Sequence, residues 1–452
     1  MNIPRYALAA AARLDENGYE VFFVGGCVRD MVMGIKPHDY DLATNALPEE
    51  IKKCFPDFTT VLTGEKHGTV CVVSEGENIE ITTYRNDGEY SDFRHPETVS
   101  FTNSLEKDLS RRDFTVNAMA YSEKTGLVDP FGGREDIGRK IIRCVGVPEK
   151  RFGEDALRIL RALRFSARFG FKIEQKTAAA IREMKELILK VSAERIFSEL
   201  CGIITAEHAE KLLLDFPEVI TVVLPELSAS VGFEQKNIHH CYDVYTHTAK
   251  VVSGCPPDTA LRLAALFHDC GKPSCFFMGD DGQGHFYGHA SAGAELAGEA
   301  LTRLKSPNKI KSLVCELVKL HDREIVNTRR AVKRFMRAAS REAAERIFAL
   351  KKADNLALAP EYHSRTELIR ETENTMKSIV ENQECFSLKQ LCINGNTLIE
   401  NGFEPSRQLG EILSALLDAV IDGRAANEKE DLLRLAQELR AQGTHPQVQS
   451  PE

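Results

Sequence analysis

Two aspartates that follow a glycine turn are the residues of this chain best suited to chemistry. Gly25-Gly26 comes directly after an apolar run, and Asp39-Tyr40-Asp41 follows shortly afterwards. Carboxylates two positions apart on a strand point to the same face. Two carboxylates beside a phosphate-binding turn suit Mg²⁺ that carries a nucleoside triphosphate. We therefore predict that Asp39 and Asp41 hold Mg²⁺ and form the catalytic pair of a nucleotidyl-transfer site.

A strand, a turn and a helix must position this pair. The run 21–24, Val-Phe-Phe-Val, is typical of a buried strand. The glycines let the backbone turn tightly and approach a ligand closely. A helix over 28–33 would offer free N–H groups to a phosphate. We accordingly predict that Gly26 and Arg29 bind the nucleotide.

Four further runs extend this pattern. They are Thr63-Gly64-x-x-His67-Gly68-Thr69-Val70, Glu80-x-Thr82-Thr83-Tyr84-Arg85, Tyr90-x-Asp92-x-Arg94-x-Pro96 and the segment 108–120, Asp-Leu-Ser-Arg-Arg-Asp-Phe-Thr-Val-Asn-Ala-Met-Ala. Together with the glycine turn and the aspartate pair, they resemble the polymerase-beta-type nucleotidyltransferase superfamily. Within it, the chain resembles the bacterial class II CCA-adding enzymes of tRNA and their relatives, the poly(A) polymerases.

The resemblance implies a reaction and a set of site residues. The reaction is template-independent addition of CCA to tRNA 3′ ends from CTP and ATP, with Mg²⁺ as cofactor. Glu80 is either a third carboxylate near the metal or an inward glutamate with a structural role only. The run 90–96 resembles the flexible loop thought to move these enzymes from adding C to adding A. Paired arginines suit fork-like binding of triphosphate oxygens. The implied nucleotide-binding residues include Arg111, Arg112, Asp113, Asn117, Arg161 and Arg164, of which Asp113 and Asn117 either contact ribose or brace the arginines.

Asp155 and Arg158 are predicted to select the base. They lie three residues apart in an expected helix 154–169, so their side chains would lie together. A carboxylate accepts from an exocyclic amino group, and a guanidinium donates to a ring nitrogen. Cytosine and adenine present that pair of groups, whereas guanine and uracil present the reverse. The alternative is an N-terminal aspartate favoured by the helix dipole and a salt bridge between the two side chains.

A histidine-rich stretch in the second half predicts a second metal site. His247, His268-Asp269 and Asp354 resemble the ligand set of the HD metal-dependent phosphohydrolase superfamily. The resemblance implies a mixed nitrogen and oxygen site for Mn²⁺, Ni²⁺, Fe²⁺ or Zn²⁺. By analogy with binuclear members, His289 and His321 are candidates for a second ion. Hydrolysis, for example of 2′,3′-cyclic phosphates on damaged RNA ends, stays open beside a structural metal or a scaffold that holds tRNA.

The predicted fold class is an α/β polymerase-beta-like nucleotidyltransferase head followed by an all-α neck, an HD-type helical domain and a helical tail. Short β-rich runs fill the first part of the chain, and the pattern is helical from Gly153 onward. The expected boundaries are 1–148 for the head, 149–232 for the neck, 233–358 for the HD domain and 359–440 for the tail. The tail would bind tRNA, and residues 441–452 are expected to be disordered.

Composition narrows the class further. The chain has 452 residues and a net charge of −9, which argues against a protein coated by nucleic acid. A local excess of basic residues over 150–195 suits a confined polyanion such as a triphosphate or one RNA end. Scattered cysteines without a Cys-x-x-Cys pair, no signal-peptide layout and no membrane-length apolar run predict a cytoplasmic protein that binds no membrane.

Two alternative functions remain. The first keeps the chemistry and changes the product: an enzyme that adds only A, or a poly(A) polymerase. His67-Gly68-Thr69 favours the CCA-type pattern over the polymerase. The second alternative is an HD phosphohydrolase regulated by nucleotide binding. The sequence does not determine the oligomeric state.

Overall fold

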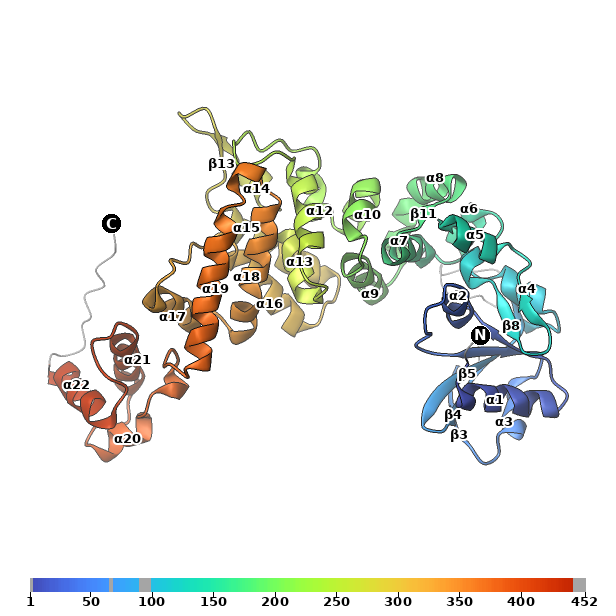
Figure 1. The fold of residues 1–452 in the computed structure, drawn as a ribbon, viewed down its shortest axis with the longest axis horizontal. Coiled ribbons are helices and arrows are strands. Elements are labelled where there is room, and N and C mark those ends of the chain that lie inside the picture. The colour runs from blue at the N-terminus through green and yellow to red at the C-terminus, as the bar shows by residue number, and fades with distance from the viewer. Residues whose placement is uncertain (1–2, 65–67, 89–98, 442–452) are drawn as a thin grey trace. The chain divides into compact units, whose positions relative to one another are not determined.

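The computed structural model describes residues 3–64, 68–88 and 99–441. The chain divides into two compact units, Met1–Ser228 with Ala300–Ser306 and Ala229–Glu299 with Pro307–Glu452 (Figure 1). None of the helices in the described ranges is long and apolar enough to cross a membrane. The predicted run 90–96 and His67 lie outside the described residues, as does 442–452.

The first unit begins with a seven-stranded mixed sheet in the order β3-β4-β5-β2-β1-β8-β9. The strands are β1 (Val21–Val24), β2 (Asp41–Thr44), β3 (Thr59–Gly64), β4 (Thr69–Ser74), β5 (Glu77–Thr83), β8 (Ala120–Ser122) and β9 (Gly126–Val128). β2 pairs with β5 in parallel, and the other neighbours are antiparallel. The predicted α/β head and strand 21–24 are thus confirmed.

Alternating side chains of the sheet enter two separate cores. Phe23 and Leu42 pack on one face with α1 (Arg5–Glu16) and α3 (Pro48–Cys54). Phe22 and Ala43 pack on the other face with Leu109 of α4 (Leu105–Ser110). This period of two is what a sheet buried on both faces requires.

Helices follow the sheet in the first unit. They are α5 (Gly133–Arg139), α6 (Pro148–Glu154), α7 (Leu157–Phe169), α8 (Gln175–Met184), α9 (Ala193–Ile204), α10 (Ala209–Asp215) and α11 (Pro217–Val223). The expected single helix 154–169 is wrong at its start, because the chain is extended at Asp155, with φ −139° and ψ 103°. Asp155 Oδ1 accepts from the backbone N–H of Leu157 at 3.1 Å. Such side-chain bonds compete with the helical hydrogen bonds and interrupt the helix.

The second unit is helical. α12 (Val244–Gly254), α13 (Thr259–Phe267), α16 (Asn308–Leu320) and α18 (Arg341–Leu356) pack on one another, with α19 (Arg365–Glu381) against α18. α20 (Gly395–Glu400), α21 (Arg407–Ile421) and α22 (Lys429–Ala441) share a separate core that includes Leu416 and Leu432. The helical architecture agrees with the predicted fold class, while the domain boundaries at 148, 232, 358 and 440 stay predictions.

Candidate active site and metal centre

A cavity of about 740 Å³ in the first unit gathers nearly all the predicted nucleotide-site residues. Its walls contain Gly25, Gly26, Arg29, Asp39, Asp41, Arg111, Arg112, Asp113, Asn117, Asp155, Arg158 and Arg161, together with Asp30, His38, Phe165 and Arg168. Arg164 is the exception, because its Nε donates to Glu199 Oε2 at 2.6 Å. The walls thus combine carboxylates at one place with a high density of guanidinium groups.

The carboxylates gather where β2 begins. Asp41 is the first residue of β2, and Asp39 lies just before the strand, so the prediction that both stand on a strand is wrong for Asp39. Glu80 of β5 is the register partner of Asp41. Burial, and then the charges of Asp39 and Glu80, raise the pKa of Asp41 to about 6. Carboxylates that repel one another in this way fit a divalent cation, which would offset the repulsion.

The glycine turn leaves room for Arg112. Gly25 has φ +72°, and a Cβ atom there would lie 2.8 Å from Arg112 Nη1. α2 (Gly26–Val32) starts directly after it, two residues earlier than predicted. Asp108 is a buried residue for which the sequence predicted no role. Its Oδ1 lies 2.8 Å from Arg111 Nη2, and its Oδ2 lies 3.3 Å from Arg112 Nη2. Asp108 precedes the two arginines by three and four residues, a spacing that brings side chains together on one helical turn, and this spacing was the sequence signal for the contacts.

Asp113 and Asn117 brace arginines. Arg161 Nη2 lies 2.8 Å from Asp113 Oδ2, and Asn117 Nδ2 donates to Asp113 Oδ1 at 3.0 Å. Burial alone would raise the pKa of Asp113, but Arg161 and Asn117 lower it to about 2. Asn117 Oδ1 in turn accepts from Arg29 Nη1 at 2.7 Å. Of the two predicted roles, these contacts favour bracing.

Arg29 is itself buried among these partners. Its Nη2 lies 2.7 Å from Asp30 Oδ1, and its guanidinium stacks on the rings of Phe165 and Phe169, 5.2 and 4.8 Å from their centroids. Cation–π contacts of this kind fix the guanidinium plane. The described donors of Arg29 therefore point at protein groups on the cavity wall.

Asp155 and Arg158 line the same cavity but are held by different partners. Arg195 Nη2 of α9 lies 2.9 Å from Asp155 Oδ2. Arg158 Nη1 lies 2.8 Å from Glu154 Oε2, and Arg158 Nη2 donates to the carbonyl of Arg111 at 3.0 Å. The alternative of a salt bridge between Asp155 and Arg158 is therefore wrong. The break between α6 and α7 separates the two side chains.

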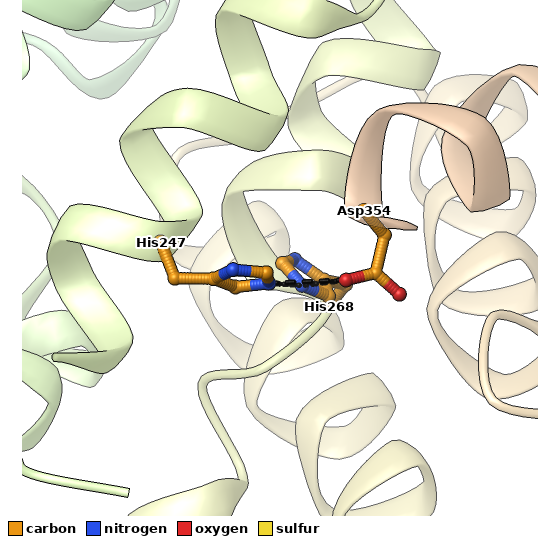
Figure 2. A group of neighbouring side chains, drawn as sticks. All are labelled: His247, His268 and Asp354. Atoms are coloured by element: carbon orange, nitrogen blue, oxygen red, sulfur yellow. Dashed lines mark hydrogen bonds and ion pairs between the residues drawn. The ribbon is translucent and has the colours of Figure 1, made fainter. Parts of the chain in front are cut away.

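In the second unit, three helices bring together a first group of candidate metal ligands, His247, His268 and Asp354 (Figure 2). His247 lies on α12, His268 at the end of α13 and Asp354 on α18. His247 Nε2 lies 3.0 Å from Asp354 Oδ1 and 3.3 Å from His268 Nε2. Two nitrogen ligands at 2.0–2.1 Å from a tetrahedral ion lie about 3.3 Å apart.

A second group consists of Asp269, His289 and His321, all buried. His289 Nε2 lies 3.2 Å from His321 Nε2 and 3.5 Å from Asp269 Oδ1. Asp269 Oδ2 lies 3.2 Å from His268 Nε2, so its two oxygens face the two groups. The six predicted HD-site residues thus meet around one bridging carboxylate.

The other ring nitrogens explain why these groups fit cations. The Nδ1 atoms of His268, His289 and His321 lie 2.7, 2.8 and 2.6 Å from the carbonyls of Ala265, Phe286 and Val318. Donation from Nδ1 to a carbonyl leaves a lone pair on Nε2. The lone pairs of His289 and His321 face each other at 3.2 Å and repel unless a cation lies between them.

Three family profiles match the chain. They are the poly A polymerase head domain over 21–143, the probable RNA and SrmB-binding site of polymerase A over 170–230 and tRNA nucleotidyltransferase domain 2 over 288–436. The first spans the sheet and the cavity arginines Arg29, Arg111 and Arg112. The third begins one residue before His289.

Curated proteins and solved structures give the same picture. The CCA-adding enzyme of Ligilactobacillus salivarius is 32% identical over 455 residues, which cover 97% of this chain and 98% of that protein. The CCA-adding enzyme of Geobacillus kaustophilus is 46% identical over 226 residues, so the chain spans about half the length of this relative. The structure of the Bacillus stearothermophilus CCA-adding enzyme in complex with CTP has a TM-score of 0.71 and 30% identity, covering 98% of this chain and 99% of that one.

Proposed function

The chain belongs to the CCA-adding enzyme family, and from this membership we propose that it adds CCA to tRNA 3′ ends from CTP and ATP without a nucleic-acid template. The observation that carries the proposal is the single cavity in which the aspartate pair, the arginines and the base-selecting pair meet. A cytoplasmic location and tRNA binding by the tail belong to the same proposal.

Asp39 and Asp41 would hold Mg²⁺, because they are the clustered carboxylates whose repulsion a cation offsets. When bound, Mg²⁺ lowers the pKa of the attacking 3′-hydroxyl and neutralises the leaving pyrophosphate. Arg111 and Arg112, held in place by Asp108, offer donors to the triphosphate oxygens. Catalysis then consists of positioning and electrostatic stabilisation by groups that are already oriented.

Asp155 and Arg158 would select the base from the cavity wall. Asp155 offers a fixed acceptor for the exocyclic amino group of cytosine or adenine, because Arg195 donates to its Oδ2 at 2.9 Å and to its Oδ1 at 3.4 Å. Arg158 keeps its orientation through Glu154 and the Arg111 carbonyl. Guanine and uracil would place a carbonyl against the carboxylate and an N–H against the guanidinium, which costs binding energy.

Transfer assays test this proposal. Labelled CTP and ATP, separately and together, are offered with Mg²⁺ to tRNA that ends at the discriminator base. We expect two C and then one A, with loss of at least about 100-fold in rate in Asp41→Ala. Label from ATP alone, only on tRNA that already ends in CC, would identify an A-adding enzyme instead. Long A tails on unrelated RNA would identify a poly(A) polymerase.

We propose a second activity, metal-dependent phosphohydrolysis, for the second unit. The observation that favours it is the bridging position of Asp269 between two groups of ligands. His247, His268, Asp269 and Asp354 would hold one ion, and His289 and His321 would complete the other with Asp269. Mn²⁺- or Ni²⁺-dependent hydrolysis of 2′,3′-cyclic phosphates by the protein, lost in His268→Ala, is the expected result. If nucleotide transfer were absent but hydrolysis responded to CTP or ATP, a nucleotide-regulated phosphohydrolase would replace the main proposal.

A further inference from the structure

In the second unit, three aromatic rings cluster on a hairpin next to the candidate metal centre, each 5.4–5.6 Å from the other two. β12 (Phe277–Met278) and β13 (Gly284–His285) form the hairpin, which projects from the helices (Figure 1). The rings of Phe277 and His285 are stacked at 5.4 Å with an angle of 26°. Those of His285 and Tyr287 are stacked at 5.6 Å with an angle of 18°. We name Phe277, His285 and Tyr287 the ring platform.

Phe277 and Tyr287 are more exposed than the half-buried rings that anchor the hairpin. Phe276 contacts Phe233 and Phe286, with ring centroids 5.5 and 5.7 Å away, and these inner rings anchor the hairpin. By contrast, Phe277 is 45% exposed and Tyr287 is 76% exposed. Phe277 and His285 are cross-strand partners, which by itself accounts for their contact. Tyr287 lies beyond the strand, so hairpin pairing does not account for its ring.

The platform is continuous with the metal centre. Tyr287 precedes the candidate ligand His289 by two residues, so their α-carbons are at most about 7.6 Å apart. The inner ring of Phe286 lies 5.2 Å from Lys272 Nζ, which in turn lies 2.8 Å from Asp269 Oδ2. An exposed aromatic surface and the candidate metal centre therefore lie within the reach of one short segment of nucleic acid.

From this arrangement we propose that the ring platform stacks an unpaired nucleobase of a single-stranded RNA 3′ end and so presents the adjoining phosphate to the metal centre. Phe277 and Tyr287, whose rings lie 5.5 Å apart at an angle of 41°, both expose aromatic surface on which a base can stack, and every base has a face that can do so. The inference rests on the proposed phosphohydrolase for its purpose and names the substrate class of that site as RNA ends. Base stacking itself needs no metal and can be measured separately.

The first test uses the absence of tryptophan from the sequence. Tyr287→Trp places a single fluorophore on the platform, and Leu388→Trp places one at another exposed position of the same unit as a control. With EDTA present, short oligoadenylate should quench Tyr287→Trp and leave Leu388→Trp unchanged. An abasic ribose-phosphate oligomer should quench neither. Equal quenching by the abasic oligomer, or no quenching by oligoadenylate, would overturn the platform as a base site.

The second test concerns catalysis and uses Tyr287→Ala with Tyr287→Phe as its matched control. For a short RNA with a 2′,3′-cyclic phosphate, Tyr287→Ala should raise KM by about 5- to 150-fold, the value of one base stack, while Tyr287→Phe stays near the parent. For a base-free ribose 2′,3′-cyclic phosphate, neither variant should differ from the parent. If the parent hydrolyses neither substrate, the phosphohydrolase proposal fails, and the fluorescence result still decides the platform. Emission that shifts with protein concentration alone would assign the face to a second copy and contradict the proposal.

Discussion

Arg195 and Asp155 form an ion pair, 2.9 Å from Nη2 to Oδ2, across 40 residues of sequence. The carboxylate proposed to select the base is therefore oriented by α9, a helix that contributes none of the cavity-wall residues named above. A base that donates its amino group to Asp155 meets an oxygen that is already fixed in place. Preorganisation of this kind reduces the cost of ordering on binding.

We predict that Arg195→Ala weakens base discrimination more than transfer itself. Without the guanidinium, Asp155 keeps its charge but loses the partner that fixes it. Incorporation of UTP and GTP relative to CTP and ATP should rise by about tenfold, the equivalent of one lost hydrogen bond to a charged group. Steady-state kcat/KM for each of the four nucleotides measures this ratio.

Arg182→Ala is the control for this prediction. Arg182 belongs to the neighbouring helix α8 and pairs with Glu218 at 2.8 Å, away from the cavity. It should leave the ratio unchanged. An equal effect of both substitutions, or a uniform loss for all four nucleotides in Arg195→Ala, would contradict the role given to Arg195.

Gly25→Ala should weaken CTP and ATP binding. The new Cβ atom would lie 2.8 Å from Arg112 Nη1 and displace that guanidinium from the triphosphate site. Gly34→Ala is matched to it, since Gly34 has the same φ of +72° but open space around its Cβ position. Both variants lose about 1–2 kcal/mol of stability to the unfavourable backbone conformation. Equilibrium binding should show a lower CTP affinity for Gly25→Ala than for Gly34→Ala, with thermal unfolding as the check that both variants are folded. Equal affinities would show that the position of Arg112 does not depend on Gly25.

Asp113→Asn should destabilise the first unit in a pH-dependent way. The pKa of Asp113 is lowered to about 2 in the folded protein, against an ordinary value near 3.9 when unfolded. The stabilisation is therefore fully present above pH of about 4 and is lost as the pH falls toward about 2. At neutral pH it amounts to about 2–3 kcal/mol.

Thermal unfolding of the parent and Asp113→Asn across this pH range tests the sign. The gap between their midpoints should be widest at neutral pH and should narrow below pH of about 4. A gap that is constant with pH would mean that Asp113 acts through packing and neutral hydrogen bonds rather than through its charge beside Arg161.

Mn²⁺ or Ni²⁺ should raise the unfolding temperature of the protein by binding the folded second unit. Asp269→Ala should remove most of this shift because both ligand groups lose their shared carboxylate. Glu361→Gln, a change at an exposed residue of the same unit, should keep it. EDTA should reverse the shift without impairing CCA addition once Mg²⁺ is restored. An undiminished shift in Asp269→Ala would place the ions elsewhere.

The sequence predicted the head strongly because its motifs are local. The strand 21–24 and the turn at Gly25 are adjacent along the chain, and the arginine pair lies inside one continuous motif, 108–120, so each signal can be read from a short run of residues. The orientation of Asp155, one of the two residues proposed to select the base, depends instead on Arg195, which is distant in sequence, and on a helix break at Asp155 itself. An extended residue inside a run of good helix formers gives a weak sequence signal, so a single helix 154–169 was expected and the break at Asp155 was missed.

The candidate metal centre differs in the same way between what was predictable and what was not. The sequence predicted His247, His268, Asp269 and Asp354 as candidate ligands from their resemblance to a known ligand set, and the structure brings them together. That Asp269 turns one oxygen to each group follows from the packing of α12, α13, α16 and α18, which periodicity alone does not specify. The ring platform had no sequence signal, since scattered aromatic residues in a loop are more often core than surface.

Sequencing of tRNA 3′ ends after reaction with all four nucleoside triphosphates tests the central claim most directly. If Asp155 and Arg158 select the base inside the cavity, tRNA that ends at the discriminator base should finish with CCA and no longer extension, despite the presence of GTP and UTP. Asp155→Asn should then introduce U or G at these positions. Mixed ends or homopolymer tails made by the parent protein would contradict selection by these side chains.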